Sequence, residues 1–337
     1  MYRADNAMEL QNQSIHYCES SYGEFASKFS KDVLKGLTAE KKHLPCKYIY
    51  DKRGSRLFQK IMDLPEYYPT DCEKEILTQN GNEISQYFSA EPLSIIELGA
   101  GDGAKTEILL RAMLSRKMDL RYIPIDISES AVEGLVHRLT QTYYDLYTAG
   151  LVSEYFHGLK HLSAIEKRKK LVFFLGSNIG NMTYEESMNF LSSLRDSVNK
   201  DDHVFIGFDL KKDFSILNKA YNDSKGITAE FNKNILVRIN KELMGNFNVN
   251  NFRFHSFFEP GESAVVSYLV SKKNQGVLIK DLNLSFELDK CEAIHTESSY
   301  KYTEEMIYTM AAESGFSVVK NFKDKKNYFM DSLWMVI

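Results

Sequence analysis

A glycine-rich turn is the part of the sequence whose residue types and spacing point most clearly to chemistry. It reads ELGAGDGAK over residues 97–105, with glycines at Gly99, Gly101 and Gly103, and it follows the apolar run 93–98. Glycine is needed where a backbone turns sharply out of a strand and must lie close against a ligand. Dinucleotide-binding turns use the spacing GxGxxG, whereas these glycines are spaced GxGxG. The turn is therefore either a cofactor loop, with a spacing that disfavours NAD, or an ordinary strand-to-helix turn.

An acidic residue at the end of the next expected strand favours the cofactor loop. Asp126 closes the apolar run YIPID (122–126), where a carboxylate can accept hydrogen bonds from ribose hydroxyls. Together, the GxGxG turn and this acid resemble the first motifs of class I S-adenosylmethionine-dependent methyltransferases. The resemblance implies S-adenosyl-L-methionine as the cofactor, bound by Gly99, Gly101 and Asp126, with Lys105 at the cofactor carboxylate.

Short apolar strands alternate with helices around these motifs. Strands are expected at 93–98, 122–126, 171–175 and 203–209, and helices at 105–116, at 183–198 and from about Ser128. Thr183 and Glu186 have the spacing of a capping box. Strands this apolar, alternating with helices, indicate a parallel sheet covered on both faces. With two more strands at 317–322 and 332–337, the expected fold class is α/β and resembles the Rossmann-like, mostly parallel, seven-stranded sheet of class I methyltransferases.

The pattern changes after about residue 212, which predicts a second lobe. A helical stretch at 217–237 precedes strands at 252–258 and 264–270, and residues 282–288 alternate between apolar and polar side chains. Antiparallel strands placed after a parallel sheet predict an α+β lobe. We therefore expect a loose N-terminal arm (1–21), a substrate-binding lobe (22–71 and 212–301) and a cofactor-binding methyltransferase domain (72–211 and 302–337).

The composition argues against several classes of protein. Of 337 residues, 43% are hydrophobic, and 42 Lys and Arg against 46 Asp and Glu give a net charge of −4. The hydrophobic fraction is sufficient for a buried core. The slightly negative net charge argues against a basic surface that binds nucleic acid. No apolar run is long enough to span a bilayer, and the N-terminus lacks the apolar stretch of a secretory signal. The four cysteines lack a CxxC pair, so neither zinc nor disulfides are expected. We expect a cytoplasmic monomer without nucleic-acid or membrane partners.

Four further blocks, spread from about residue 47 to the C-terminus, carry a more specific resemblance. They are YIYDKRGSRLF (48–58), LPEYYPT (64–70), GSNIGN (176–181) and TESSYK (296–301), accompanied by Asp209-Leu210 and Ala220-Tyr221. In this order they are similar to the histidine-specific methyltransferases, a family best known for making histidine betaine (hercynine) for ergothioneine biosynthesis. The resemblance implies Nα-trimethylation of L-histidine by in-line displacement, without a metal.

The resemblance also implies which residues bind the amino acid. Asn181 and Tyr221 would bind its carboxylate, because an amide and a phenol donate to an anion without adding a competing charge. Glu297 and Ser299 would bind the imidazole, one accepting from a ring N–H and the other completing the ring's hydrogen bonds, with Ser298 beside them. Each charged group of the substrate needs such a partner, since unpaired charges in a pocket are costly.

Two tyrosines are implied at the reacting nitrogen. Tyr50 would face the α-amine as the catalytic residue, and Tyr67 would lie between substrate and cofactor. Their hydroxyl groups and ring faces can hold an amine and its methylated cations. A proton must leave the ammonium before the nitrogen can attack, and the backbone carbonyl near Gly176, with water, is the expected acceptor. The expected site is a closed cavity where two lobes meet.

One segment departs from the family pattern. After the third sheet strand the family carries an acidic residue followed by an aromatic residue that contacts the adenine. This sequence reads EYFHG over residues 154–158, without an aspartate at the expected place. His157 and Gly158 are the expected adenine contacts here. Backbone groups can still read the edge of the ring, so the expected cofactor is unchanged.

Each of these residues also has a purely structural interpretation. Tyr67 and Tyr68 could be core aromatics, Asn181 could cap the following helix, and Glu297 could be a solvated strand residue. Three other functions stay open: Nα-methylation of another aromatic amine such as tryptophan, an NAD-dependent oxidoreductase, and a non-catalytic module that senses cofactor or amino acid. Glu297 and Ser299 favour imidazole over indole, since an indole offers only one donor.

Overall fold

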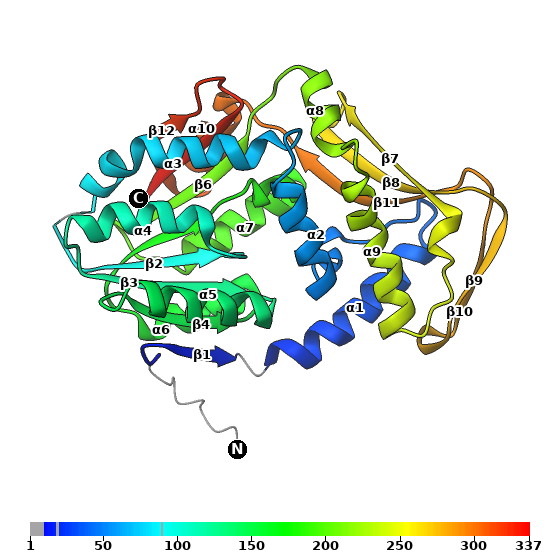
Figure 1. Cartoon of the computed structure of the whole chain (residues 1–337), viewed down its shortest axis with the longest axis horizontal. Coiled ribbons are helices and arrows are strands. Elements are labelled where there is room, and N and C mark those ends of the chain that lie inside the picture. Colours follow the sequence, from blue (N-terminus) through cyan, green and yellow to red (C-terminus); the bar gives the residue numbers. More distant parts are fainter. Residues whose placement is uncertain (1–9, 18–19, 89) are drawn as a thin grey trace. The chain divides into compact units, whose positions relative to one another are not determined.

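The computed structural model describes residues 10–17, 20–88 and 90–337 (Figure 1). They form two compact units, each with its own β-sheet. Unit 1 takes the described part of Met1–Ser21 together with Asp71–Leu210 and Tyr302–Ile337, and unit 2 takes Tyr22–Thr70 and Lys211–Lys301.

Unit 1 is built on a sheet whose eight described strands have the order β1-β4-β3-β2-β5-β6-β13-β12. They are β1 (Ser14–Tyr17), β2 (Leu93–Leu98), β3 (Leu120–Asp126), β4 (Tyr147–Val152), β5 (Lys169–Phe174), β6 (His203–Asp209), β12 (Phe316–Lys323) and β13 (Phe329–Val336). The strands from β1 to β6 are parallel, and β13 and β12 pair antiparallel at one edge. Apart from β1, this is the strand order of class I methyltransferases, which confirms the expected fold class. The strand order reverses between β2 and β5, and open α/β sheets bind ligands at the carboxyl ends of the strands at such a point.

Strand β1 differs from the loose arm expected over residues 1–21 and adds an eighth strand to the expected seven. Ser14–Tyr17 pair in parallel with β4 at the edge of the sheet (Figure 1). The Ile15 side chain packs against three valines of a small apolar cluster. The pairing covers backbone groups of β4 that would otherwise form an open edge. Residues 1–9 and 18–19 lie outside the described part of the chain.

Helices connect these strands, and one of them confirms the expected capping box. They are α3 (Tyr68–Gln86, which begins in unit 2), α4 (Ala104–Ser115), α5 (Glu129–Thr142), α6 (Tyr155–Ile165), the 3-10 turn η2 (Asn178–Asn181), α7 (Tyr184–Asp196) and α10 (Glu304–Glu313). The Thr183 hydroxyl accepts from the Glu186 N–H at 3.2 Å, and the Glu186 carboxylate accepts from the Thr183 N–H at 2.8 Å. Because Thr183 caps its own helix, the interpretation of Asn181 as that cap is wrong.

Unit 2 combines helices with short antiparallel sheets around one apolar core. Its helices are α1 (Ser20–Thr38), η1 (Cys46–Ile49), α2 (Lys52–Met62), α8 (Phe214–Tyr221), α9 (Ile227–Glu242), η3 (Val249–Asn251) and η4 (Lys280–Leu282). Its strands are β7 (Phe252–Glu259), β8 (Ala264–Ser271), β9 (Gln275–Ile279), β10 (Leu284–Leu288) and β11 (Ala293–Tyr300). Strands β7, β8 and β11 lie side by side with β8 in the middle, and β9 pairs with β10 (Figure 1). The core draws on both chain segments of the unit, from Phe29 to Tyr67 and from Leu217 to Ile294.

The single helical stretch expected at 217–237 is two helices, α8 and α9. The chain breaks at Gly226, whose φ of +74° lies in the left-handed region that glycine adopts without strain. The Asp223 carboxylate accepts from the N–H groups of Ile227 and Thr228 at 2.9 and 2.8 Å. These bonds satisfy donors at the start of α9 that have no partner within the helix, which stabilises the break.

Glu97, the residue that precedes the glycine-rich turn by two positions, is buried inside unit 1. Its side chain on β2 accepts hydrogen bonds from the hydroxyls of Thr106, at 2.6 Å, and Tyr122. Burial raises the pKa of Glu97 to about 7, although both hydroxyls favour the charged form. A carboxyl whose pKa is raised by folding stabilises the fold fully below its unfolded pKa and loses that contribution as the pH rises through the folded pKa.

Replacing Glu97 with glutamine is expected to flatten the pH dependence of stability. Between about pH 6 and about pH 8 the wild type should lose about 1 kcal/mol of unfolding free energy through this group, and E97Q should not. Urea unfolding of both proteins at the two pH values measures the difference. Burial also raises the pKa of Glu297 to about 7. Glu297 is present in both proteins, so its effect on the unfolding free energy cancels in the comparison. Identical slopes would contradict the assignment.

Two searches of the described residues gave negative results. No helix among them is long and apolar enough to cross a bilayer. No group of three or more His, Cys, Asp or Glu side chains within the described ranges is arranged to hold a metal ion.

Candidate active site

The glycine-rich turn connects β2 to α4 in unit 1 and lies in the left-handed region of backbone conformation. Gly99, Gly101 and Gly103 have φ angles of +73°, +55° and +65°, which glycine adopts without strain. A Cβ at Gly103 would lie 2.5 Å from the Leu135 side chain, whereas a Cβ at Gly101 would meet no described atom within 4 Å. The turn is therefore tightly packed at Gly103 and open at Gly101, where a ligand can approach the backbone.

Asp126, at the end of β3, holds this turn from one side. Its carboxylate accepts from the Gly101 N–H at 3.0 Å and from the Ser128 N–H at 2.9 Å. Burial raises the pKa of Asp126, which the backbone N–H groups partly offset. Each carboxylate oxygen has two lone pairs, so the acid can also accept from ribose hydroxyls. The open turn and the adjacent acid fit the nucleoside part of S-adenosylmethionine.

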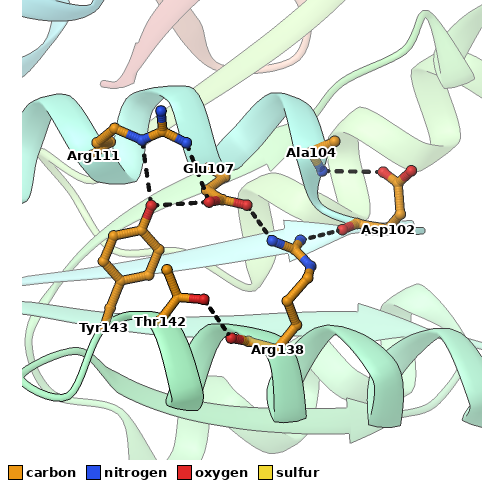
Figure 2. A network of polar contacts seen from close by, with 7 residues as sticks. All are labelled: Asp102, Ala104, Glu107, Arg111, Arg138, Thr142 and Tyr143. Carbon is orange, nitrogen blue, oxygen red and sulfur yellow. Dashed lines mark hydrogen bonds and ion pairs between the residues drawn. The ribbon is translucent and has the colours of Figure 1, made fainter.

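A polar network on α4 and α5 holds the same turn from the other side (Figure 2). The Arg138 guanidinium on α5 donates to the main-chain carbonyl of Asp102 at 2.7 Å and pairs with the Glu107 carboxylate on α4. Glu107 also accepts from Tyr143, at 2.9 Å, and from Arg111, at 3.3 Å. Although burial opposes it, these donors lower the pKa of Glu107. The sequence analysis did not identify these residues, since they lie at unremarkable helix positions.

Replacing Arg138 with alanine is expected to weaken cofactor binding about two- to fivefold. The guanidinium is 43% exposed, so its ion pair contributes little beyond fixing the turn. Isothermal titration of S-adenosylmethionine measures the effect. Arg111→Ala is the matched control, because Arg111 contacts Glu107 but not the turn. Equal losses of affinity in the two variants would show that the network acts only through helix stability.

Lys105, the residue expected at the cofactor carboxylate, forms an ion pair within unit 1. Its ammonium pairs with Glu73 of α3, whose side chain is fully buried. Glu73 also accepts from the Gly176 N–H at 2.7 Å. The carboxylate thus connects the start of α4 to the turn after β5. Glu73 was not among the predicted site residues, although it lies three residues after the LPEYYPT block (64–70).

Asp331 of β13 completes this buried cluster. Its side chain is fully buried, and its carboxyl oxygens accept no hydrogen bond from a described donor. Burial and the neighbouring Glu73 carboxylate raise the pKa of Asp331 well above its usual range. The raised pKa favours the neutral form of Asp331, and the Lys105 ammonium pairs with the Glu73 carboxylate.

The turn after β5 carries the expected residues Gly176 and Asn181. Gly176 and Ser177 have φ angles of +77° and +55°, and the Ser177 hydroxyl accepts from the Asp209 N–H at 3.0 Å. Asn181 ends η2 and is half-buried. The Asn178 amide lies 3.3 Å from the Cβ position of Gly99. Unit 1 therefore brings the two turns together at the carboxyl ends of β2 and β5.

The segment expected to contact adenine starts α6. His157 is exposed, and the Gly158 N–H donates to the Glu154 carbonyl at 3.0 Å. A Cβ at Gly158 would lie 3.0 Å from Ile125, so this glycine allows α6 to pack closely on the sheet. The Tyr155 hydroxyl lies 2.7 Å from the Cβ position of Gly99. Glu154 and Tyr155 are themselves an acidic residue followed by an aromatic one, which is the signal that the sequence analysis passed over.

In unit 2, strand β11 places two polar residues on one face, and the residue after the strand continues the pattern. Successive side chains of an extended chain point to opposite faces, so Glu297, Ser299 and Lys301, which directly follows β11, share one side. An irregularity in the pairing with β8 lies between His295 and Glu297. The Ser298 hydroxyl bonds to the His295 ring at 2.9 Å. The Ser298 side chain therefore lies on the opposite face of β11 from Glu297 and Ser299.

Tyr221 of α8 meets this face of β11. Its hydroxyl lies 2.6 Å from the Ser299 hydroxyl, and the Lys301 ammonium donates to Tyr221 at 3.0 Å and to Ser299 at 2.7 Å. The three polar groups are buried, with Lys301 only 1% exposed. Tyr221, predicted to bind the substrate carboxylate, and Ser299, predicted to bind the imidazole ring, are therefore in direct contact.

Glu297 is also buried, with 8% of its surface exposed, which excludes the interpretation as a solvated strand residue. Burial raises the pKa of Glu297 to about 7, while the Lys301 charge and a hydrogen bond from Asn232 oppose the rise. Thr296 donates to the Asn232 carbonyl oxygen at 2.6 Å and so fixes the amide. Glu297 can therefore both accept and donate a proton near neutral pH.

Aromatic rings form a continuous row in unit 2. The ring centroids lie 5.4 Å apart for Tyr50 and Phe58, 6.1 Å for Phe58 and Tyr67, and 6.2 Å for Tyr67 and Tyr221. The row links both expected tyrosines to the Tyr221 hydroxyl. Tyr68 differs, because its ring and hydroxyl contact Lys212 instead.

Comparison with known proteins shows the family of this chain. A family model described as histidine-specific, S-adenosylmethionine-dependent methyltransferase matches residues 29–336. The chain is 35% identical to histidine N-alpha-methyltransferase of Mycolicibacterium smegmatis over 86% of its length and 89% of that protein. It is 33% identical to the protein of the same name from Mycobacterium tuberculosis, over 90% of the chain and 93% of that protein. It is 28% identical to ergothioneine biosynthesis protein 1 of Schizosaccharomyces pombe, over 83% of the chain and 37% of that protein. The chain therefore belongs to the histidine-specific, S-adenosylmethionine-dependent methyltransferase family.

Proposed function

We propose that this protein transfers methyl groups from S-adenosylmethionine to the α-amine of L-histidine, in three steps that give histidine betaine. Two relatives that match nearly the whole chain are named histidine N-alpha-methyltransferase. The observation that carries the proposal is the buried pair of Glu297 and Ser299 on one face of β11. An acid and a hydroxyl fit the two nitrogens of an imidazole, whereas an indole would leave one of them without a partner.

The residues of unit 2 bind the amino acid in this proposal. Glu297 accepts from one ring N–H, and Ser299 bonds to the other ring nitrogen. The Tyr221 hydroxyl donates to the substrate carboxylate, and Asn181 of unit 1 is assigned to the same group. The aromatic row from Tyr50 to Tyr67 offers ring faces to the amine and to the cations that it becomes.

The residues of unit 1 bind the cofactor. Asp126 accepts from the ribose hydroxyls, and the open backbone at Gly101 lies against the nucleoside. Lys105 is assigned to the cofactor carboxylate. Its ammonium also pairs with Glu73. The adenine is assigned to the start of α6, where Tyr155 joins the expected His157. Gly158 packs the helix against the sheet.

The chain contributes alignment and proton removal to the reaction. The bound cofactor supplies an electrophilic methyl group, so no Lewis acid is needed. Holding an amine in line with such a carbon is worth up to roughly 7–11 kcal/mol. Tyr50 orients the amine, which loses one proton before each of the three transfers, and water hydrogen-bonded to the carbonyl at Gly176 takes that proton. The trimethylated product has no lone pair, and the reaction stops.

The purified protein, incubated with S-adenosylmethionine and each amino acid separately, tests the proposal by mass spectrometry. We expect mass gains of one, two and three methyl groups on histidine alone. Methylation of tryptophan or another aromatic amine in place of histidine would overturn the substrate. Cofactor binding without methylation of any amino acid would favour the sensing module.

A further inference from the structure

We propose that Glu73 is a positioning residue for cofactor binding, whose buried carboxylate holds the Lys105 ammonium where the carboxylate of the cofactor can reach it. The inference rests on one part of the proposed function, which is the assignment of Lys105 to the cofactor carboxylate. It does not depend on which amino acid the protein methylates. Glu73 itself contacts no part of the cofactor in this proposal and acts only through Lys105.

Burial separates the roles of the two partners in this ion pair. The Glu73 side chain is fully buried, whereas the Lys105 side chain keeps 19% of its surface exposed. Both residues belong to unit 1. A ligand at the glycine-rich turn can therefore reach the ammonium but not the carboxylate that pairs with it.

The Glu73 carboxylate is fixed in place by a turn, a helix and a strand of unit 1. Its Oε1 accepts from the Gly176 N–H at 2.7 Å, and its Oε2 pairs with the Lys105 ammonium on α4. Gly207 of β6 makes room for the carboxylate, since a Cβ at this residue would lie 2.5 Å from Oε1. Glycine inside a strand often marks such a close approach. The sheet is therefore shaped to hold this carboxylate.

This arrangement places the Lys105 ammonium beside the turn after β5. A Cβ at Gly176 would lie 3.0 Å from the Nζ atom of Lys105, although Lys105 itself lies at the start of α4, directly after the turn that follows β2. The strand order reverses between β2 and β5, and open α/β sheets bind ligands at such a point. Glu73 therefore holds the ammonium at the part of the sheet where a ligand is expected.

Ordering Lys105 in advance should strengthen cofactor binding. A lysine side chain loses rotamer freedom when it binds a ligand, and this loss lowers the affinity. Glu73 orders the side chain before the cofactor arrives. It also keeps the ammonium charged, because burial alone would lower the pKa of Lys105, whereas the charge and hydrogen bond of Glu73 raise it. An ammonium has three N–H donors, so Lys105 can bind Glu73 and a second carboxylate together.

The test compares two ligands that differ in whether they carry the carboxylate. S-adenosylhomocysteine has the amino-acid part of the cofactor, and methylthioadenosine has the same thioether nucleoside without it. Isothermal titration measures the Kd of each ligand. In Glu73→Gln, which keeps an oxygen for the Gly176 N–H but has no charge, we expect the affinity for S-adenosylhomocysteine to fall about tenfold. The affinity for methylthioadenosine should stay at the wild-type value.

A second variant and a control accompany Glu73→Gln. Gly207→Ala keeps Glu73 but places a Cβ against its Oε1, so it should cause the same selective loss to a smaller extent. It decides the test if Glu73→Gln does not fold, which thermal unfolding reports for each variant. Glu83→Gln is the matched control, because it breaks an ion pair of the same helix, α3, with Lys320 at the surface. It should bind both ligands as the wild type does.

Lys105→Met separates the proposal from the assignment on which it rests. If this variant keeps the wild-type difference in affinity between the two ligands, Lys105 does not bind the carboxylate, and the assignment and the proposal both fail. If Lys105→Met loses the difference while Glu73→Gln and Gly207→Ala keep it, only the role of Glu73 is overturned. Equal losses of affinity for both ligands in Glu73→Gln would make Glu73 purely structural and would also overturn the proposal.

Discussion

Replacing Glu297 with alanine is expected to raise the KM for histidine about ten- to a hundredfold. The substitution removes the acceptor of one ring N–H and leaves that group unpaired in a buried site, which costs about 1.5–3 kcal/mol for a charged partner. Steady-state kinetics with histidine measures the change. Cofactor affinity, measured by titration, should stay at the wild-type value because Glu297 belongs to unit 2, whereas the cofactor is assigned to residues of unit 1.

The raised pKa of Glu297 predicts how the KM for histidine changes with pH. Burial raises the pKa of Glu297 to about 7, so the carboxylate gains a proton as the pH falls through that value. The neutral acid attracts a ring N–H less strongly, and the imidazole itself becomes charged near pH 6.5. The histidine KM of the wild type should therefore rise below about pH 7. In Glu297→Gln, whose side chain cannot titrate, the KM should rise only where the imidazole of the substrate becomes charged. Identical pH profiles of KM in the wild type and Glu297→Gln would exclude Glu297 from the ring-binding site.

Replacing Asp126 with alanine is expected to weaken cofactor binding about a hundredfold or more. The carboxylate is assigned to two ribose hydroxyls and also accepts from the Gly101 N–H at 3.0 Å. Its loss removes charge-assisted hydrogen bonds and releases the turn at the same time. Isothermal titration with S-adenosylmethionine measures the affinity.

Asp102→Asn is the matched control for Asp126→Ala. Asp102 lies in the same turn and is exposed, and its carboxylate accepts from the Ala104 N–H at 3.0 Å, whereas Arg138 contacts its main-chain carbonyl, which the substitution keeps. The Asp102→Asn variant should bind S-adenosylmethionine with an affinity within a few-fold of the wild-type value. Wild-type affinity in Asp126→Ala would exclude the ribose assignment, and a loss as large in Asp102→Asn would show that the turn tolerates no change.

Local patterns in the sequence determined much of unit 1. Apolar runs bounded by turns predicted β2, β3, β5 and β6, because strands buried on both faces are apolar throughout. The capping box at Thr183 was predictable because both of its residues lie within one helical turn. The GxGxG spacing predicted a sharp turn out of a strand, and the glycines there have the positive φ angles that glycine adopts without strain.

Contacts between distant segments decided the rest. Strand β1 exists because β4, far along the chain, leaves an edge to pair with. Glu73 pairs with Lys105 and accepts a hydrogen bond from the Gly176 N–H. Both residues are distant from Glu73 in the sequence, and no sequence pattern predicts these contacts. The face that Ser298 occupies depends on the register of β11 against β8, and a change of one residue reverses it. Lys301 follows a strand that begins many residues after α8 ends, yet its ammonium donates to the Tyr221 hydroxyl. A sequence pattern reports which residues neighbour one another along the chain, whereas burial and charge pairing depend on which residues the fold brings together.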